Sequence, residues 1–320
     1  KALAICHKRQ SVRKQNAEKG EKRIMPAVIA AFLCPLFHAV SNIIDAHLSN
    51  NVFRKLPTLI FYNCLTNFFA APMVLVFGLP QWYGWEIMPL LALVGMIDVF
   101  YQIPYYEALR RGDTSVVVAW FSLGYVLVPV LAYLMVDEKL SFVQYAGFGI
   151  IIAASVVLNI ENPRKIKINK AFYLMLLSSL LLSLQAVLYK YALEKTDWIS
   201  AVFYSALFST LTVFGFLMPR IVRLNIKANF PRYKTKFYVF GLNEFVNQVG
   251  TVASIFAMSL LPVVAVESIN STQPLFVLGI GAALYALFGN RFKEDVSTVH
   301  LLRKSICFVF ITAGVFMVLK

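Results

Sequence analysis

Ten stretches of about 20 mostly apolar residues, separated by short polar breaks, constrain this chain more than any other feature. They lie at about 25–49, 57–79, 86–109, 114–136, 142–160, 171–193, 199–218, 237–260, 263–288 and 301–319. Each is long enough to cross a hydrocarbon layer about 30 Å thick as a helix, and none alternates in polarity as a barrel strand does. The sequence therefore predicts an all-α integral membrane protein with ten transmembrane helices.

The composition leaves little room for anything else. Of the 320 residues, 59% are hydrophobic and 14% are charged, whereas about a quarter of the residues in a soluble domain are charged. Ten spans of about 20 residues leave too few residues for a sizeable soluble domain such as a kinase, a nuclease or a Rossmann enzyme. Two connections are longer than the rest, 161–169 and 219–236. The first suggests a division into a basic N-terminal tail (1–23), a five-helix half (24–160), a basic linker (161–169) and a second five-helix half (170–320).

The net charge of +14 arises from basic residues that lie almost entirely between the apolar stretches. Basic residues in this position orient membrane proteins and contact anionic headgroups, so we expect membrane lipids as partners and no nucleic acid. The four cysteines show no CxxC spacing, and ATP-binding, HExxH and GxSxG motifs are absent. We therefore predict no metal, no cofactor and no enzymatic activity. The basic tail also excludes an intact signal peptide within residues 1–23.

A weak internal repeat supports the division into halves. Asp98-Val-Phe-Tyr-Gln102 in the third stretch corresponds to Glu244-Phe-Val-Asn-Gln248 in the eighth, with an acid and a Gln at the same spacing. Leu36–Val40 likewise resembles Ser183–Val187. Because each half has five helices, the second copy must enter from the opposite side of the membrane. Two inverted repeats with a site near the midplane are typical of secondary transporters.

Several motifs in the first half resemble a known family. They are EALRRGDTSVVVA at 107–119, Pro129, DEKLS at 137–141, and QYAG at 144–147 followed by Gly149. In these positions the chain resembles the EamA-type half of the drug/metabolite transporter (DMT) superfamily, and the second half is the poorer match. The resemblance implies a ten-helix transporter of small metabolites, with a cavity formed mainly by helices 1, 3, 4, 6, 8 and 9.

The orientation in the membrane follows from the tail and from the resemblance. Both favour cytoplasmic N- and C-termini, whereas the positive-inside rule applied to the short loops favours the opposite orientation. We expect cytoplasmic termini, in the inner membrane of a bacterium. A reporter fused to the C-terminus distinguishes the two orientations.

Polar residues inside the apolar stretches are the candidate functional groups, because ionisable side chains are costly at bilayer depth. Asp98 and Glu244 occupy repeat-equivalent positions, and at helical spacing from them lie Tyr101, Gln102, Asn247 and Gln248. These groups form either the wall of a cavity that binds a polar solute or a proton, or buried contacts that stabilise packing between the halves.

Other spans offer further candidates. The ninth carries Glu267, Asn270 and Gln273 before the helix-breaking Pro274, and these residues either contact a solute or begin a helix at the membrane surface. The remaining predicted site residues come from the first, fourth and sixth spans: His38, Asn42, Trp120, Gln185 and Tyr189. His38 is either a proton relay or a packing residue. For Lys190 we expect a side chain that extends to the membrane surface.

These observations favour a secondary transporter that moves a small polar or amphipathic metabolite, such as an amino acid, by alternating access. Proton coupling through Asp98, Glu244 or Glu267 is the accompanying hypothesis, and export or exchange is the expected mode. The alternative is a lipid flippase or lipid-active membrane enzyme whose basic loops hold phosphate headgroups. The solute and the oligomeric state do not follow from the sequence.

Overall fold

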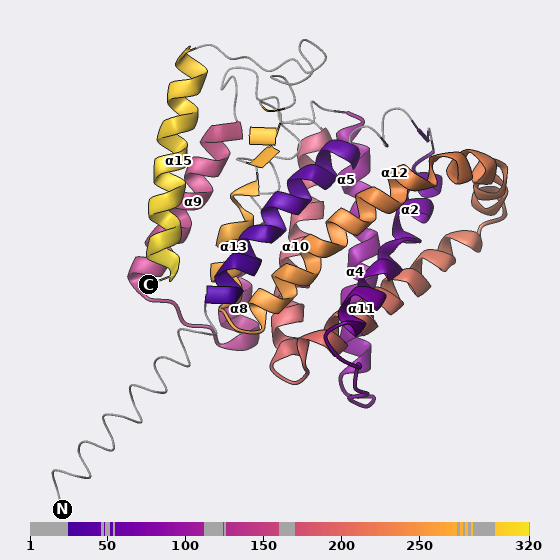
Figure 1. Ribbon diagram of the computed structural model, residues 1–320, viewed down its shortest axis with the longest axis horizontal. Helices are drawn as coiled ribbons and strands as arrows, with labels where there is room; N and C mark the ends of the chain where they lie inside the picture. The colour runs from indigo at the N-terminus through magenta and orange to yellow at the C-terminus, as the bar shows by residue number, and fades with distance from the viewer. Residues whose placement is uncertain are drawn as a thin grey trace, which may run out of the picture.

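The structure is a computed structural model. It describes residues 25–45, 48, 52–53, 55–111, 124, 126–159, 170–273, 276–277, 279–280, 283 and 298–319. All regular secondary structure within these residues is helical, as predicted, and the helices form one bundle (Figure 1).

Five helical segments in the described residues are long and apolar enough to cross a membrane. They are Met25–Asp45, Leu56–Leu75, Met88–Leu109, Lys170–Leu193 and Trp198–Leu217. The second comprises α2 (Leu56–Cys64), the 3-10 helix η1 (Asn67–Phe69) and α3 (Ala70–Leu75), and the third comprises α4 (Met88–Phe100) and α5 (Gln102–Leu109). The last two are α10 (Lys170–Leu193) and α11 (Trp198–Val213) with the 3-10 helix η3 (Phe214–Leu217). These segments agree with five of the predicted spans.

The remaining helices are α8 (Val128–Val136), α9 (Phe142–Asn159), α12 (Arg220–Met258), α13 (Val263–Asn270) and α15 (Thr298–Leu319). Parts of the predicted spans at 114–136 and 263–288 lie outside the described residues. The chain is a multi-pass helical membrane protein, and the count of ten spans stays a prediction.

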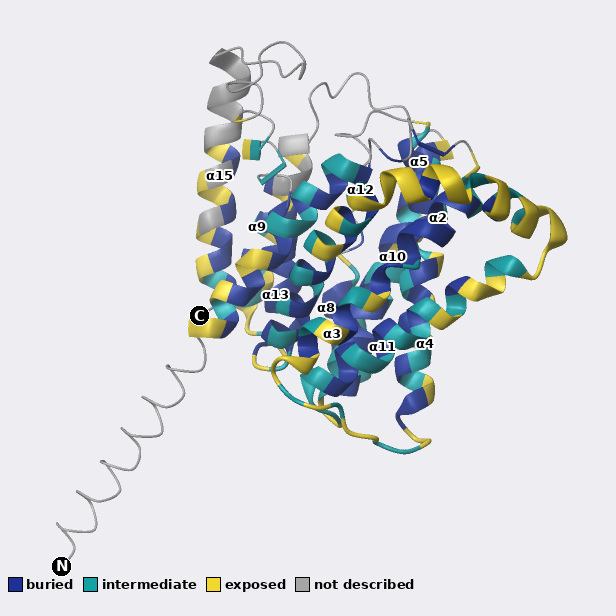
Figure 2. Cartoon of the chain, turned by 45° about the vertical axis from the view of Figure 1, so that its right-hand side comes forward, coloured by how far each residue is buried: buried dark blue, intermediate teal, exposed yellow. Residues whose placement is uncertain are grey.

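The long connection predicted at 219–236 is wrong, because α12 begins at Arg220 and continues through this segment. Its six basic residues and Pro231 indicated a loop, yet Pro231 lies inside the helix. A proline in a helix removes one backbone donor and costs about 3 kcal/mol. Apolar side chains such as Ile221 and Leu224 lie exposed on this part of α12, which extends beyond the bundle (Figure 2). Basic and apolar residues together thus form a helix rather than a loop.

The contact between α9 and α15 depends on two glycines. A Cβ atom on Gly314 would lie 2.6 Å from Ile151 Cγ1, and one on Gly147 would lie 2.6 Å from Met317 Cβ. The two helices therefore approach as closely as their backbones allow, and they lie side by side (Figure 1). Gly149, on the same helix as Gly147, has no neighbour within 4 Å of an added Cβ.

Two charged side chains hold the turn between α12 and α13. Glu138 accepts hydrogen bonds from the backbone N–H groups of Val263 (3.0 Å) and Val264 (3.1 Å) at the start of α13. Lys190 donates to the carbonyl oxygens of Met258 and Leu261, both at 2.9 Å, at the end of α12. Each charge opposes the dipole of the helix end that it contacts. The ammonium group of Lys190, expected to extend to the membrane surface, therefore has protein partners at this helix end.

The start of α11 is fixed by Asp197, whose carboxylate accepts hydrogen bonds from Ser200 N (2.9 Å), Ser200 Oγ (2.6 Å) and Tyr83 OH (2.8 Å). Burial raises the pKa of Asp197, but these hydrogen bonds favour the carboxylate and lower it below its ordinary value. The cap fixes the position of α11, which carries Ser205 and Ser209 into the centre of the bundle.

Candidate functional site: a polar cavity within the helix bundle

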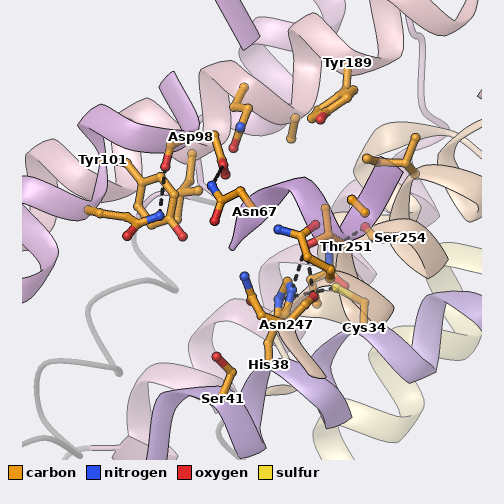
Figure 3. Close-up of a pocket in the computed structure, with 18 of the residues that line it drawn as sticks. Cys34, His38, Ser41, Asn67, Asp98, Tyr101, Tyr189, Asn247, Thr251 and Ser254 are labelled. Carbon is orange, nitrogen blue, oxygen red and sulfur yellow. Dashed lines mark hydrogen bonds between the residues drawn. The ribbon is translucent and has the colours of Figure 1, made fainter. Parts of the chain in front are cut away.

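A cavity of about 160 Å³ lies between the helices, and most of the predicted site residues line it (Figure 3). Those on its wall are Asp98, Glu267, His38, Asn42, Tyr101, Gln102, Gln185, Tyr189, Asn247, Gln248, Asn270 and Gln273. Trp120 lies outside the described residues. Glu244 does not line the cavity. The structure therefore brings together side chains that are up to 235 positions apart in the chain.

Two helix interruptions place polar groups on the cavity wall. The second span changes from α2 to the 3-10 helix η1 at Asn67. The third span is interrupted at Tyr101, between α4 and α5, three residues before Pro104. Pro104 has no backbone N–H to continue the helix, and the carbonyl of Tyr101 accepts a hydrogen bond from Ser178 Oγ (3.0 Å). Both interruptions lie next to Asp98 or its partners.

Asp98 is held by side chains from two other helices. Its Oδ2 atom accepts hydrogen bonds from Asn67 Nδ2 (2.6 Å) and from Ser209 Oγ (2.8 Å) on α11. Asn67 Nδ2 also lies 2.7 Å from Ser209 Oγ, so the three groups form one network. Gln102 donates to the backbone carbonyl of Asp98 at 3.1 Å, not to its carboxylate.

Glu267 lies on a different wall of the cavity, on α13, and is 5% exposed. Its Oε1 atom accepts a hydrogen bond from Asn270 Nδ2 at 3.2 Å, and Asn270 Nδ2 also contacts Ser254 Oγ at 3.3 Å. The ninth span is therefore buried within the bundle where it carries Glu267.

Glu244 is buried beside the cavity and is bonded within its own helix. Its Oε1 atom accepts hydrogen bonds from Asn247 Nδ2 (3.2 Å) and Gln248 Nε2 (2.6 Å). The expectation of Glu244 as part of the wall differs from the structure, in which its partners Asn247 and Gln248 line the cavity and Glu244 does not. In the first half, the equivalent Gln102 binds backbone instead, so Asp98 reaches the cavity while Glu244 does not.

His38 lies opposite Asp98 in the view of Figure 3, among side chains of α12. Its Nε2 atom is 3.3 Å from Thr251 Oγ1, and its Nδ1 atom is 3.5 Å from Cys34 Sγ. An added Cβ on Gly250 would lie 2.9 Å from the imidazole ring. Both proposed roles of His38, relay and packing, are compatible with this position, since the ring contacts both the cavity and α12.

A third carboxylate, Asp45, was not predicted as a site residue. It is 8% exposed, lines the cavity and accepts hydrogen bonds from Tyr106 OH (2.7 Å) and Asn243 Nδ2 (2.8 Å). The sequence placed Asp45 near the end of its span, where an acid is common. The helix places it against the tyrosines of α5 instead.

The cavity also uses helices that the sequence resemblance did not assign to it. Asn63, Asn67 and Ala70 come from the second span, and Val202, Ser205 and Ala206 come from α11. The spacing of Asn63 and Asn67, one helical turn apart, is the signal that could have identified the second span. Ser205 gives no such signal, because serine is common within apolar spans.

The chemistry of this wall is that of reversible binding. Carboxylates, amides and hydroxyls surround a small volume that is shielded by apolar helices. Among the described residues, no group of three or more His, Cys, Asp or Glu side chains has the arrangement of a metal site. A polar cavity thus lies within a helix bundle in which five described segments are long and apolar enough to cross a membrane.

Comparisons with known proteins relate part of the chain to a transporter family. Residues 25–160, which make up less than half of the chain, match the EamA-like transporter family. A solved crystal structure, described only as that of a protein, has a TM-score of 0.63 with 12% sequence identity. The alignment covers 93% of this chain and 96% of that one, so the two share a fold. No curated protein matches the sequence.

Proposed function

We propose that the protein is a secondary transporter of a small polar or amphipathic metabolite, and that the cavity is its solute-binding site. The observation that carries this proposal is the polar cavity lined by both halves of the chain. Asp98 and Asn67 come from the first half, whereas Gln185 and Glu267 come from the second. A site shared between halves changes its access when the halves rotate against each other.

Two inverted five-helix repeats and alternating access complete the proposed mechanism. The corresponding acid and Gln pairs, 98–102 and 244–248, support the repeats, since each pair has the same spacing and places its Gln on the cavity wall. Coupling to protons through the buried carboxylates is part of the proposal. A carboxylate that exchanges a proton for a solute lets the empty carrier return without an unpaired charge in the membrane.

The dimensions of the cavity favour a small solute over a lipid. An engineered protein cavity of about 150 Å³ holds one benzene molecule, and the cavity here measures about 160 Å³. Its wall contains three carboxylates and several amides, which an acyl chain would leave without partners. The flippase alternative thus has no support from this site.

The proposal is tested by uptake into liposomes that contain the purified protein. The vesicles are exposed to a pooled metabolite extract with and without an inward proton gradient, and internal solutes are identified by mass spectrometry. We expect at least one small polar solute to accumulate above the level in protein-free liposomes, and faster uptake with the gradient. If folded protein moves no solute under either condition and does move a fluorescent lipid, the proposal is wrong.

A further inference from the structure

The charged side chains of the cavity all have the same sign. Asp45, Asp98 and Glu267 line it, and no Lys or Arg is found among the described residues of its wall. The one histidine among them, His38, has its two ring nitrogens next to Thr251 and Cys34 and not next to a carboxylate. The nearby cation Lys190 is bound to the carbonyl oxygens of Met258 and Leu261. A carboxylate inside a membrane requires a positive charge or a proton. The wall does not supply the positive charge, so a solute or a proton must.

Hydrogen-bond acceptors without partners lie beside two of these carboxylates. Asn67 and Asn270, which are 2% and 6% exposed, each have a side-chain oxygen that is buried and has no hydrogen-bond partner. Their NH2 groups are already donated to Asp98 and Glu267. A carboxylate accepts hydrogen bonds and donates none, so each amide must present its oxygen elsewhere. Two walls of the cavity therefore combine a carboxylate with an unused amide oxygen.

The cavity has one unpartnered donor as well. The buried Nδ2 atom of Asn42 has no hydrogen-bond partner, and Asn42 lines the cavity near Asp45. A solute hydroxyl or carbonyl oxygen would satisfy it. Tyr101 and Tyr189 add aromatic groups to the cavity lining, and the faces of such rings attract cations (Figure 3).

We propose that the cavity selects small organic amines, with the charged nitrogen bound by a carboxylate and the neighbouring amide oxygen. This inference rests on the proposed function and specifies its solute class. An ammonium group carries three donors and a positive charge, and it meets the unused acceptors at Asp98–Asn67 or at Glu267–Asn270. A neutral solute leaves the charge uncompensated, and an anionic solute is repelled by all three carboxylates.

The test compares three probes that share a hydroxyphenyl ring and a two-carbon chain but differ in charge. Tyramine is cationic, tyrosol is neutral and para-hydroxyphenylacetate is anionic. Binding is measured by isothermal titration calorimetry with the protein in lipid nanodiscs, with the heat from empty nanodiscs subtracted. We expect tyramine to bind about tenfold or more tighter than either of the others, because it alone forms charge-assisted hydrogen bonds. Equal affinities, or tightest binding of the acid, would overturn the inference.

Two isosteric variants locate the site. Asp98→Asn or Glu267→Gln should weaken tyramine binding about tenfold and should not weaken tyrosol binding, because the neutral solute no longer faces an uncompensated charge. The control is Asp137→Asn, whose carboxylate is exposed outside the cavity. Unchanged tyramine affinity in both cavity variants would also overturn the inference. The comparison of probes needs only the unaltered protein, so it remains decisive if a variant does not fold.

The outcomes separate this inference from the proposed function. If liposomes accumulate a solute that is not an amine and tyramine binds no tighter than tyrosol, the protein is a transporter of another solute class. If tyramine binds tightly but neither tyramine nor any other solute crosses the membrane, the cavity is an amine site and the proposed transport is wrong.

Discussion

Replacing Ala206 with Trp should reduce solute uptake to the level of protein-free liposomes. Ala206 lies on α11, lines the cavity and is 8% exposed. An indole ring at this position fills a large part of a volume of about 160 Å³, because a cavity of about 150 Å³ holds a single benzene molecule. The initial uptake rate of the solute identified from the metabolite pool is the quantity to measure.

The matched control is Leu211→Trp on the same helix. Leu211 is 53% exposed and does not line the cavity, so an indole there extends outward. We expect this variant to transport at the unaltered rate. A smaller substitution, Ala206→Leu, should give an intermediate rate and guards against misfolding of the Trp variant. Full transport by a folded Ala206→Trp variant would show that solute does not pass through this cavity.

The largest change in stability is expected at the contact between α9 and α15. Gly314→Ala adds a Cβ atom 2.6 Å from Ile151 Cγ1 and 2.8 Å from the carbonyl oxygen of Gly147. The oxygen belongs to the backbone of a helix and cannot move alone, so the two helices must separate. Overpacking of this kind costs about 1–3 kcal/mol. The melting temperature of the purified protein in detergent should fall.

Gly149→Ala on α9 provides a control of opposite sign. An added Cβ at Gly149 has no neighbour within 4 Å, and alanine is favoured over glycine inside a helix by about 1 kcal/mol. Its melting temperature should therefore stay the same or rise. Equal decreases in both variants would indicate that the close contact between Gly147 and Gly314 is not what holds these helices together.

The sequence predicts the elements of the fold where long apolar stretches are uninterrupted. The spans at Lys170–Leu193 and Trp198–Leu217 agree with the prediction to within a few residues, because hydropathy and helix length are local properties. The helix at 220–236 was not predicted, because the basic residues and Pro231 of this segment are typical of a loop. A helix that extends from the bundle can nevertheless have exposed side chains on both faces, as this one does.

The candidate site is predictable where a residue is unusual in its surroundings. Asp98 and Glu267 are ionisable groups inside apolar spans, and both line the cavity. Asp45 and Ser209 were missed for different reasons. Asp45 lies at a helix end, where a charged residue is common. Ser209 resembles the many serines whose hydroxyl groups bond only to a backbone carbonyl of their own helix. Its contact with Asp98 depends on how α11 packs, which no local pattern specifies.

Lys190 and Glu244 illustrate the reverse case, in which an unusual residue has a structural partner. Lys190 binds the last carbonyls of α12, and Glu244 binds two amides of its own helix. Both are unusual in an apolar span because a buried charge needs a partner, but the partner is identified only by the tertiary structure.

The most direct test of the central claim is an experimental structure of the protein with its transported solute bound. The account predicts solute density inside the cavity, in contact with residues of both halves, with Asp98 or Glu267 within hydrogen-bonding distance of it. A cavity that stays empty at saturating solute, with density at the lipid-facing surface instead, would contradict the account.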